Sequence, residues 1–543
     1  MNKIGKFEII LLFVLLIAGY FCFNHVMGLR AEEPRRAVVG IEAVLGDNAL
    51  IPNIHGETYY NKPPVYNWVL ATSFLIHGSF APSAVRLPGV ISLWIIGALL
   101  FWLVRKYGEW KTALFAAIIF LTFADLIFYG AVNAGEIDLF YSLLVFLQVT
   151  AIFYFHQTKQ ILHLFLVSYF FAAASALTKG LPSIAFQGLT LLAYLTWLRD
   201  WKSIFSWKHA AGIFLFTGII GGYFFAYSKN EDALAFMINL WSESSSKSAN
   251  NAGAGSIFKA IYSFPLQLIQ VTLPWSIFFI WIKKAKWKKS PVAVFSLIFI
   301  AANIWIYWIS PELRNRYLYA FFPFLAILLA YIISDLVQSE KFDFRLSRIS
   351  AILGVIIGSA FIGLPFLEVL PTELVSRPSF FICGFLFLAI AVFQYWFPQN
   401  GFLHVAVLLA FLRLSYNISI LPVQAAESKA RYYSTQVDQI LEIAERQEVY
   451  WTGYPYSFQP ELSLAGNSFM RDTISTPPLI AYQIPYYYSL NTGSRLLYLT
   501  KPMEDKWLLG EKQYALKSGG QIYLEFKDKW TQKTLVLYQV EKP

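Results

Sequence analysis

The sequence predicts a polytopic α-helical membrane protein with about 13 transmembrane helices and a small soluble α/β domain at its C-terminal end. Hydrophobic residues make up 57% of the chain and charged residues only 14%, whereas about a quarter of the residues of a soluble protein are charged. Apolar runs of roughly 17–25 residues, each long enough to cross a bilayer, recur along most of the chain. They are continuous and do not alternate, which favours helices over a β-barrel.

Thirteen apolar runs are expected to span the membrane. They cover residues 7–27, 83–104, 112–130, 138–155, 161–177, 182–198, 210–227, 263–282, 291–309, 316–334, 349–367, 378–396 and 401–419. With the N-terminus inside, the inner segments hold 17 Lys and Arg, against 4 in the short outer loops. Inner loops normally carry this excess, so an inside N-terminus is predicted. An odd number of spans then places the C-terminal tail outside.

The net charge of +10 lies mainly in short loops between apolar runs. Membrane topology accounts for it, and no nucleic-acid partner is predicted. Both cysteines, Cys22 and Cys383, fall inside apolar runs, which indicates neither a disulfide framework nor a zinc site. The first run lacks a small-residue cleavage site, so it is expected to stay as an anchor.

Two parts are expected: a transmembrane domain over residues 1–420 and an outer α/β domain over residues 421–543. Within the first, residues 28–82 and 228–262 form long outer loops. In the tail, "RYYSTQVDQILEIAERQ" has the pattern of an amphipathic helix, and "SRLLYLT", "GGQIYLEF" and "KTLVLYQV" have the pattern of strands.

The first outer loop opens with Glu32 and Glu33, ahead of a predicted helix "EPRRAVVGIEAVLGD". Pro34 suits the first helical position, and Gly46 suits the end. One interpretation is a capped helix lying in the membrane interface, with an apolar stripe formed by Val38, Ile41, Val44 and Leu45. The other is that the paired carboxylates carry chemistry.

The same loop continues with the stiff turn Lys62-Pro63-Pro64. Its aromatic residues fit an interfacial belt; they are Tyr59, Tyr60, Tyr66 and Trp68. Lys62 differs from them, because a cation held by a rigid turn at the outer surface is well placed to meet a phosphate.

Further charged residues lie at the outer ends of later spans. They are Glu136 and Asp138 at the start of the fourth span, Lys179 at the end of the fifth, and Arg314 and Arg316 at the start of the tenth, where the polar residue Tyr317 follows. Singly, each is explained as a charged cap at the end of a span. Together with Glu32, Glu33 and Lys62 they gather on one side, which suggests a site where carboxylates handle protons or sugar and cations hold a phosphate.

These residues resemble a known family. The stretch "EEPRRAVVGIEAVLGDNALIPNIHGETYYNKPPVYNWVLATSFLIHGSFAPSAVRLP" is similar to the first outer loop of the aminoarabinose transferases and their relatives in glycosyltransferase family 83. These ArnT-like enzymes have the GT-C fold and are related to protein O-mannosyltransferases. The family pattern has an acidic pair before Pro-Arg-Tyr-Ala, then Lys-Pro-Pro with aromatics, then Arg-Leu-Pro. "TKGLPS" and "RNRYLYAFFPFLAILLA" resemble later elements.

The resemblance implies roles for the charged residues. Glu32 falls on the family's catalytic aspartate, Glu33 on its glutamate, and Asp138 on a second acidic residue of the site. Donor phosphate would be held by Lys62, Lys179, Arg316 and Tyr317, and the remaining candidate substrate residues are Arg35, Tyr60, Arg86 and Arg314.

Residues 242–256, "SESSSKSANNAGAGS", are rich in Ser, Asn, Gly and Ala. They are expected to be mobile without ligand and to fold over bound donor.

Three positions depart from the family. Glu32 stands where aspartate is common, Arg36 replaces a tyrosine, and Asn61 replaces a glutamate that helps to ligate a metal. No metal or other cofactor is therefore predicted.

The expected activity is transfer of a sugar from polyprenyl (undecaprenyl) phosphate to an envelope acceptor such as lipid A, by a monomer at the periplasmic face of the bacterial inner membrane. The alternatives are an O-mannosyltransferase-like enzyme acting on protein or another glycan, a lipid-sugar transporter or flippase, and a non-enzymatic scaffold.

Overall fold

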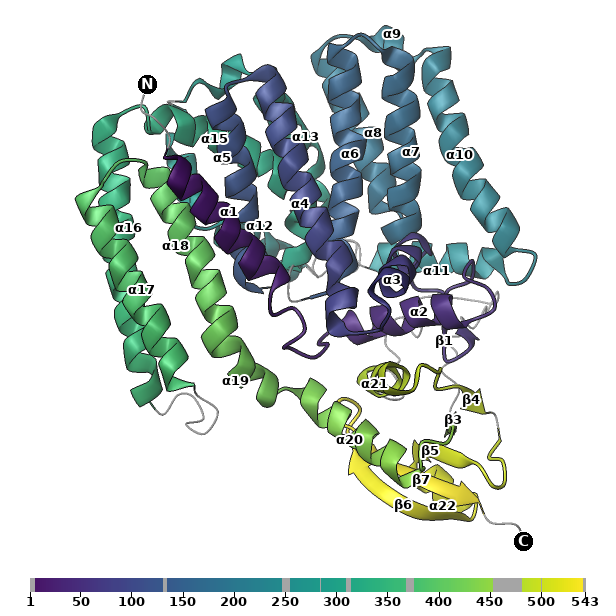
Figure 1. The fold of residues 1–543 in the computed structure, drawn as a ribbon. Coiled ribbons are helices and arrows are strands. Elements are labelled where there is room, and N and C mark those ends of the chain that lie inside the picture. The colour runs from purple at the N-terminus through teal and green to yellow at the C-terminus, as the bar shows by residue number, and fades with distance from the viewer. Residues whose placement is uncertain are drawn as a thin grey trace.

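The computed structural model describes residues 5–129, 134–246, 254–283, 285–308, 314–367, 376–452, 481–499 and 501–540. Most of the chain forms upright, roughly parallel helices (Figure 1). These are α1 (Lys6–Phe21), α4 (Pro82–Tyr107), α5 (Trp110–Leu121), α6 (Ile137–Gln157), α7 (Ile161–Lys179), α8 (Pro182–Trp197), α10 (Trp207–Tyr227), α13 (Pro291–Asn303), α15 (Phe322–Leu336), α16 (Glu340–Gly363), α17 (Arg377–Trp396) and α18 (Gly401–Ser415). The predicted fold class, a polytopic helical membrane protein with a small C-terminal sheet domain, is confirmed.

Every predicted span coincides with helical structure, but the number that qualifies by length is smaller than thirteen. Within the described residues, eight helices are long and apolar enough to cross a membrane, or nine if one bent pair counts as a single span. That pair, Ala260–Val271 and Trp275–Trp281, bends by 115°. The expected span over residues 263–282 is therefore a broken pair of helices and not one continuous helix. Pro274 stands at the break, and it cannot donate the backbone hydrogen bond that a continuous helix needs.

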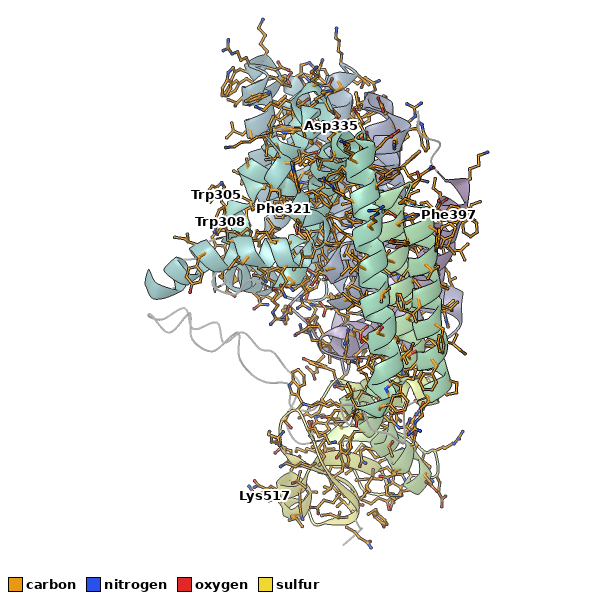
Figure 2. The ribbon with its side chains drawn as sticks, turned by 90° about the vertical axis from the view of Figure 1, so that its left-hand side faces the viewer. Trp305, Trp308, Phe321, Asp335, Phe397 and Lys517 are labelled. Atoms are coloured by element: carbon orange, nitrogen blue, oxygen red, sulfur yellow. The ribbon has the colours of Figure 1, made fainter. Side chains whose placement is uncertain are left out.

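Helices α2 (Glu33–Leu45), α3 (Val65–His77) and α11 (Ala233–Ser246) lie across one end of the upright helices. The C-terminal domain lies at the same end, while the N-terminus lies at the opposite end (Figure 1). Figure 2 marks the two ends: Lys517 lies in the sheet domain, and Asp335 lies near the opposite end of the helices. A short hairpin of β1 (Asn53–Ile54) and β2 (Glu57–Thr58) joins α2 to the Lys62 turn.

The C-terminal domain is a mixed five-stranded sheet of order β4-β3-β5-β7-β6. The strands are β3 (Val449–Thr452), β4 (Tyr498–Leu499), β5 (Trp507–Glu511), β6 (Gly520–Lys527) and β7 (Thr534–Val540), with helices α20 (Lys429–Ile443), α21 (Gln483–Thr492) and α22 (Lys512–Lys517). The predicted helix and the three predicted strands correspond to α20, β4, β6 and β7. The expected boundary at residue 420 falls inside a helical run that ends at Ala426, and the domain division itself stays a prediction.

One hydrophobic core joins the first outer loop to this domain. Val38 and Ile41 of α2 are buried together with Tyr66 of α3, and with Tyr433 and Tyr486 of the C-terminal domain. The expected interfacial stripe on α2 thus packs against protein and not against lipid. The expected aromatic belt is wrong for Tyr66, which is fully buried, whereas Trp68 is exposed. Hydrophobic periodicity shows which face of a helix is buried, and it does not show what covers that face.

Candidate active site

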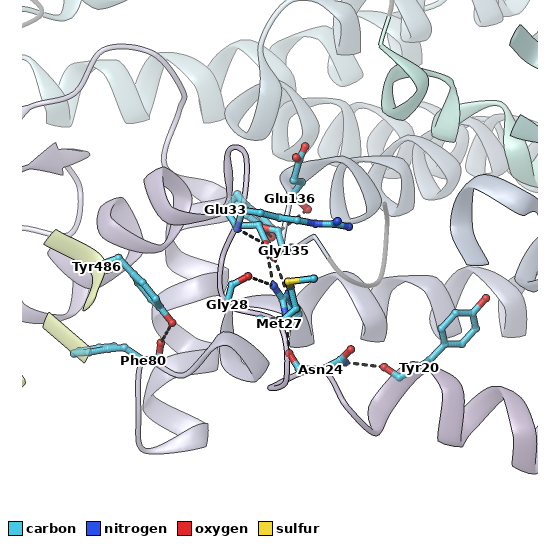
Figure 3. Close-up of polar contacts among 12 residues, drawn as sticks. Tyr20, Asn24, Met27, Gly28, Glu33, Phe80, Gly135, Glu136 and Tyr486 are labelled. Atoms are coloured by element: carbon cyan, nitrogen blue, oxygen red, sulfur yellow. Dashed lines mark hydrogen bonds and ion pairs between the residues drawn. The ribbon is translucent and has the colours of Figure 1, made fainter. Parts of the chain in front are cut away.

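Glu33 is the most enclosed of the charged residues. Its side chain is 0% exposed, and Arg86 of α4 donates to both carboxylate oxygens, at 2.8 and 3.0 Å. The backbone N–H groups of Arg30, at 2.9 Å, and of Gly135 also donate to it. In Figure 3, Gly28, which precedes α2, and Gly135, which precedes α6, both lie beside Glu33. The capped-helix interpretation would have Glu33 face the amides of its own helix, but its partners in the structure are Arg86 and the backbone N–H groups of Arg30 and Gly135.

Arg86 completes this buried cluster. Its Nη1 donates to the carbonyl oxygens of Asn24, at 2.6 Å, and Met27, at 2.8 Å. Nearby, the hydroxyl of Tyr486 in α21 donates to the carbonyl oxygen of Phe80 at 2.9 Å (Figure 3). The Glu33–Arg86 pair thus fixes the start of α2 against α4. This geometry suits a positioning role, and catalysis by Glu33 stays an untested prediction.

Glu32 occupies the N-cap of α2 and differs from its neighbour. Its side chain is 28% exposed and forms an ion pair with Arg35, one turn along the helix. Burial disfavours the charged form, but the guanidinium groups of Arg35, Arg36, Arg316 and Arg314 outweigh it and hold the pKa of Glu32 below its ordinary value. Glu32 is therefore a carboxylate at neutral pH, set among cations at the edge of the site.

A second charged group connects three elements. Lys179, at the end of α7, forms an ion pair with Asp138 at the start of α6. Arg316 lies in the short helix η5 (Asn315–Ala320); it pairs with Glu136, and its Nε lies 3.6 Å from the Asp138 carboxylate. Lys179 also lies over the rings of Tyr141 and Tyr317, with its Nζ 4.9 and 4.6 Å from their centroids. The predicted gathering of Asp138, Lys179, Arg316 and Tyr317 is thus present in the structure, while their functional roles stay predictions.

A cavity of about 440 Å³ opens beside these groups. Its lining combines acids, arginines and hydrogen-bonding neutral groups, and consists of Arg30, Ala31, Asp125, Ala134, Glu136, Asp138, Leu139, Arg314, Asn315, Arg316 and Tyr319. Arg30 and Ala31 directly precede Glu32, whose carboxylate lies within electrostatic range of Arg314 and Arg316. The space is large enough for a sugar-sized group, and such cavities with a few converging polar groups are typical binding sites.

Asp125 was not among the site residues predicted from the sequence. Its carboxylate accepts hydrogen bonds from the Tyr319 hydroxyl, at 2.6 Å, and from the Asn315 side-chain amide, at 3.1 Å. Asn315 also accepts a hydrogen bond from Gln267 of α12 (Ala254–Val271). A signal existed in the sequence, because Asp125 is an ionisable residue inside a predicted span, and such residues normally face a functional interior.

Three other predicted residues, Lys62, Tyr60 and Arg35, belong to the first outer loop and are not among the residues that line the cavity. Lys62 is buried in the turn before α3, at 9% exposure, and the hydroxyl of Tyr60 donates to Glu231 at 3.4 Å. The side-chain amide of Asn239, in α11, donates to the carbonyl oxygen of Tyr60 at 2.8 Å. Arg35 lies over the ring of Tyr482 in the C-terminal domain, 5.9 Å from its centroid. Of the expected mobile stretch 242–256, residues 247–253 lie outside the described residues.

Within the described ranges, no group of three or more His, Cys, Asp or Glu side chains is placed to hold a metal ion. Asn61, which stands where the family carries a metal-ligating glutamate, has a buried side-chain oxygen without a hydrogen-bond partner there. Among the described residues, Asn61 thus supplies an amide oxygen where the family has a carboxylate, and the expectation of no metal stays a prediction.

The fold and the cavity define a class of protein: a multi-pass helical membrane protein whose charged site lies at one end of its helices, beneath a small mixed-sheet domain. Comparison with known proteins narrows this class. Residues 61–221 match the family model described as dolichyl-phosphate-mannose-protein mannosyltransferase. The resemblance noted in the sequence is thereby supported by an independent match.

Two curated relatives have the same description, undecaprenyl phosphate-alpha-4-amino-4-deoxy-L-arabinose arabinosyl transferase. The protein from Erwinia tasmaniensis is 26% identical over 202 residues, 36% of each chain. The protein from Shewanella sediminis is 26% identical over 188 residues, 33% of this chain and 34% of its own. The chain thus matches about a third of the length of these relatives.

A solved structure is similar over nearly the whole chain. The crystal structure of ArnT from Cupriavidus metallidurans bound to undecaprenyl phosphate superposes with a TM-score of 0.71, covering 98% of both chains at 15% identity. This likeness shows that the fold is ArnT-like.

Proposed function

We propose that this protein is a membrane glycosyltransferase that moves a sugar from a polyprenyl phosphate, such as undecaprenyl phosphate, to an acceptor of the cell envelope. The observation that carries this proposal is the set of charges at and beside one cavity. Arg316 and Asp138 line the cavity, Lys179 pairs with Asp138, and the ionised, partly exposed Glu32 directly follows the lining residue Ala31. The carboxylate can activate an acceptor, and the cations can stabilise the phosphate that leaves, so the two halves of the reaction are both provided for.

The transfer follows from these groups. The acceptor oxygen forms a bond to the anomeric carbon while the bond from that carbon to the phosphate oxygen breaks. The polyprenyl phosphate leaves with the bonding electron pair, and Arg316, Lys179 and Lys62 stabilise its charge. For a hydroxyl acceptor, Glu32 takes the proton; an acceptor that is already an ionised phosphate needs no base. In both cases the Glu32 carboxylate stabilises positive charge that develops at the anomeric carbon.

The ion pairs of the ligand-free site must rearrange when donor binds. Arg316 and Lys179 both face Asp138, so an incoming phosphate shares or replaces this carboxylate as their partner. Arginine has five N–H donors in a planar fork and can keep one carboxylate while it binds a phosphate. Asp138 thus keeps both cations in place until the donor arrives.

Names of similar proteins support the lipid donor. The curated relatives are described as transferases of a sugar carried by undecaprenyl phosphate, and the similar crystal structure contains undecaprenyl phosphate. For the acceptor we favour a lipid such as lipid A. The match of residues 61–221 to a protein mannosyltransferase family supports a second candidate, transfer to protein or another glycan. We place the site and the C-terminal domain at the periplasmic face of the bacterial inner membrane, in a monomer.

A lipid-sugar transporter is the alternative from another class. It would place charged residues near the middle of paired, interrupted helices. The charges described above instead belong to α2, the start of α6 and the end of α7. These parts of the chain lie at the end of the helices that faces the C-terminal domain (Figure 1), which favours transfer at a surface.

Comparison of cells with and without the gene tests the proposal. Mass spectrometry of lipids and envelope glycans should show one polyprenyl-phosphate sugar accumulating in the mutant, together with loss of the same sugar from one envelope component. Complementation with the wild-type gene should reverse both changes, and complementation with Glu32→Gln should reverse neither. Identical lipid and glycan profiles in the two strains would contradict the proposal.

A further inference from the structure

Arg36, in the first turn of α2, is a buried cation for which the described residues provide no side-chain hydrogen bond or salt bridge. Its side chain is only 5% exposed. Nη1 is enclosed and forms no hydrogen bond, and in the described part of the chain no salt bridge joins Arg36 to a carboxylate. Buried charges are normally paired and hydrogen-bonded, because an isolated ion loses its hydration without compensation. Nη1 therefore has hydrogen-bonding capacity that no described residue uses.

The surroundings of Arg36 belong to the charged site. Its charge acts on Glu32, one helical turn earlier, and on Arg316. It also acts on Tyr66, whose hydroxyl lies 3.2 Å from the carbonyl oxygen of Glu136 and 3.3 Å from that of Gly135. Arg36, from α2, and Arg316, from η5, thus both act on the Glu32 carboxylate.

The local charge balance favours an anion. The guanidinium groups of Arg35, Arg36, Arg314 and Arg316 all act on the single carboxylate of Glu32. Arg35 already pairs with Glu32, and Arg316 with Glu136. Arg36 and Arg316 repel each other, and an oxyanion between two like charges relieves that repulsion. The planar fork of a guanidinium matches the oxygens of a phosphate.

Arg36 also distinguishes this chain from the pattern that it resembles, which has tyrosine at the corresponding position of the Pro-Arg-Tyr-Ala motif. We propose that Arg36 binds the phosphate group of the polyprenyl-phosphate donor, as a second guanidinium beside Arg316. This assignment rests on the proposed function. Tyrosine carries no positive charge and cannot pair with a phosphate. The proposal therefore predicts that donor binding depends more strongly on the residue at position 36 in this chain than in a protein with tyrosine there.

Undecaprenyl phosphate is the probe for the test, with undecaprenol, the same lipid without phosphate, as the matched ligand. Both are titrated into the purified full-length protein in lipid nanodiscs, for wild type, Arg36→Gln, Arg36→Lys and Arg36→Tyr. Loss of a charged hydrogen bond should weaken binding of undecaprenyl phosphate roughly tenfold or more in the Gln and Tyr variants. The Lys variant should keep part of the affinity, and undecaprenol binding should not change. Arg105→Gln, at the other end of α4, is the control for removal of an arginine.

A thermal unfolding curve separates ligand binding from a structural role. Because Arg36 has no bonded partner in the described residues, ligand-free Arg36→Gln should unfold at the wild-type temperature or above it, and undecaprenyl phosphate should stabilise it less than it stabilises wild type. A lower unfolding temperature without ligand would show a structural role and overturn the proposal.

The remaining outcomes are also decisive. Unchanged undecaprenyl phosphate affinity in all three variants overturns the inference, and so does an equal loss for undecaprenol. A loss confined to a phosphorylated acceptor, with lipid A and dephosphorylated lipid A as probes, would assign Arg36 to the acceptor and overturn its assignment to the donor. If wild type itself fails to bind undecaprenyl phosphate, the proposed function fails, which distinguishes that failure from a failure of the inference alone.

Discussion

Adjacent carboxylates at the start of α2 have different environments. Glu33 is enclosed and bonded to Arg86, whereas Glu32 is partly exposed and faces several cations. The sequence shows two glutamates in a row and a following proline, from which a helix start is predictable. It does not show that the partner of Glu33 lies 53 residues along the chain. Long-range pairing of this kind depends on the packing of α2 against α4, which no local pattern encodes.

Substitution of Glu33 by glutamine should destabilise the protein. The change leaves Arg86 buried without its counter-ion, and breaking a buried pair typically costs about 3–5 kcal/mol. Chemical denaturation in detergent should show this loss of unfolding free energy, while Glu32→Gln should stay close to wild type. A Glu33→Gln protein as stable as wild type would remove the positioning role of Glu33.

The pH dependence of turnover should reflect the ionisation of Glu32. Its pKa lies below the ordinary value because the surrounding guanidinium groups outweigh the effect of burial. The carboxylate is therefore fully charged near neutral pH, and its contribution should be lost only as the pH falls through this depressed value. A pH–rate profile should be flat on its acid side down to below the usual range of glutamate. A decline in turnover that begins near neutral pH would contradict this assignment.

At the scale of elements, the short helix η5 carries much of the site. It presents Arg316 to α6 and Tyr317 to Lys179, and it is held at both ends by Asp125 through Asn315 and Tyr319. Arg316 and Tyr317 were predictable as boundary charges and by resemblance. Asp125 was not recognised, although a carboxylate in an apolar run is a signal. Its partners are neutral and lie about 190 residues away, so charge pairing gave no indication.

Asp125 and Tyr319 should behave as one unit. If their hydrogen bond holds η5 in place, Asp125→Asn and Tyr319→Phe each misplace Arg316 and lower kcat/KM. The double variant should then lose little more than the worse single variant, because both changes break the same contact. A double-mutant cycle measures this coupling, and Asp343→Asn, another buried carboxylate that accepts a hydrogen bond from the backbone of Asn400, is the control. Fully additive losses would show that the two residues act independently.

At the scale of the whole molecule, apolar runs predicted the helical bundle well. Composition and hydropathy reflect the bilayer as a solvent, and this solvent acts on each span separately. The break between α12 and η3 (Trp275–Trp281), and the burial of α2 beneath the C-terminal domain, depend on the packing of distant segments. Two strands, β3 and β5, were also missed. They pair with each other in parallel, and a parallel pair has no short hairpin turn to mark it.

The two ends of the chain should lie on opposite sides of the membrane. The excess of Lys and Arg in the inner segments predicts it, and the N-terminus and the C-terminal domain lie at opposite ends of the helices. A reporter fused after Pro543 that is active only in the cytoplasm should stay silent, while the same reporter before Met1 should be active. Strong activity of the C-terminal fusion would overturn the topology.

We propose that Glu32 and the cations beside it transfer a sugar from a polyprenyl phosphate. The most direct measurement is single-turnover transfer of a radiolabelled sugar from its undecaprenyl phosphate to envelope lipids, by purified protein. Wild type should transfer the label and release undecaprenyl phosphate in equal amount. Glu32→Gln should bind the donor but transfer it roughly a hundredfold more slowly to a hydroxyl acceptor. Donor binding without any transfer by wild type, or full transfer by Glu32→Gln, would contradict the account.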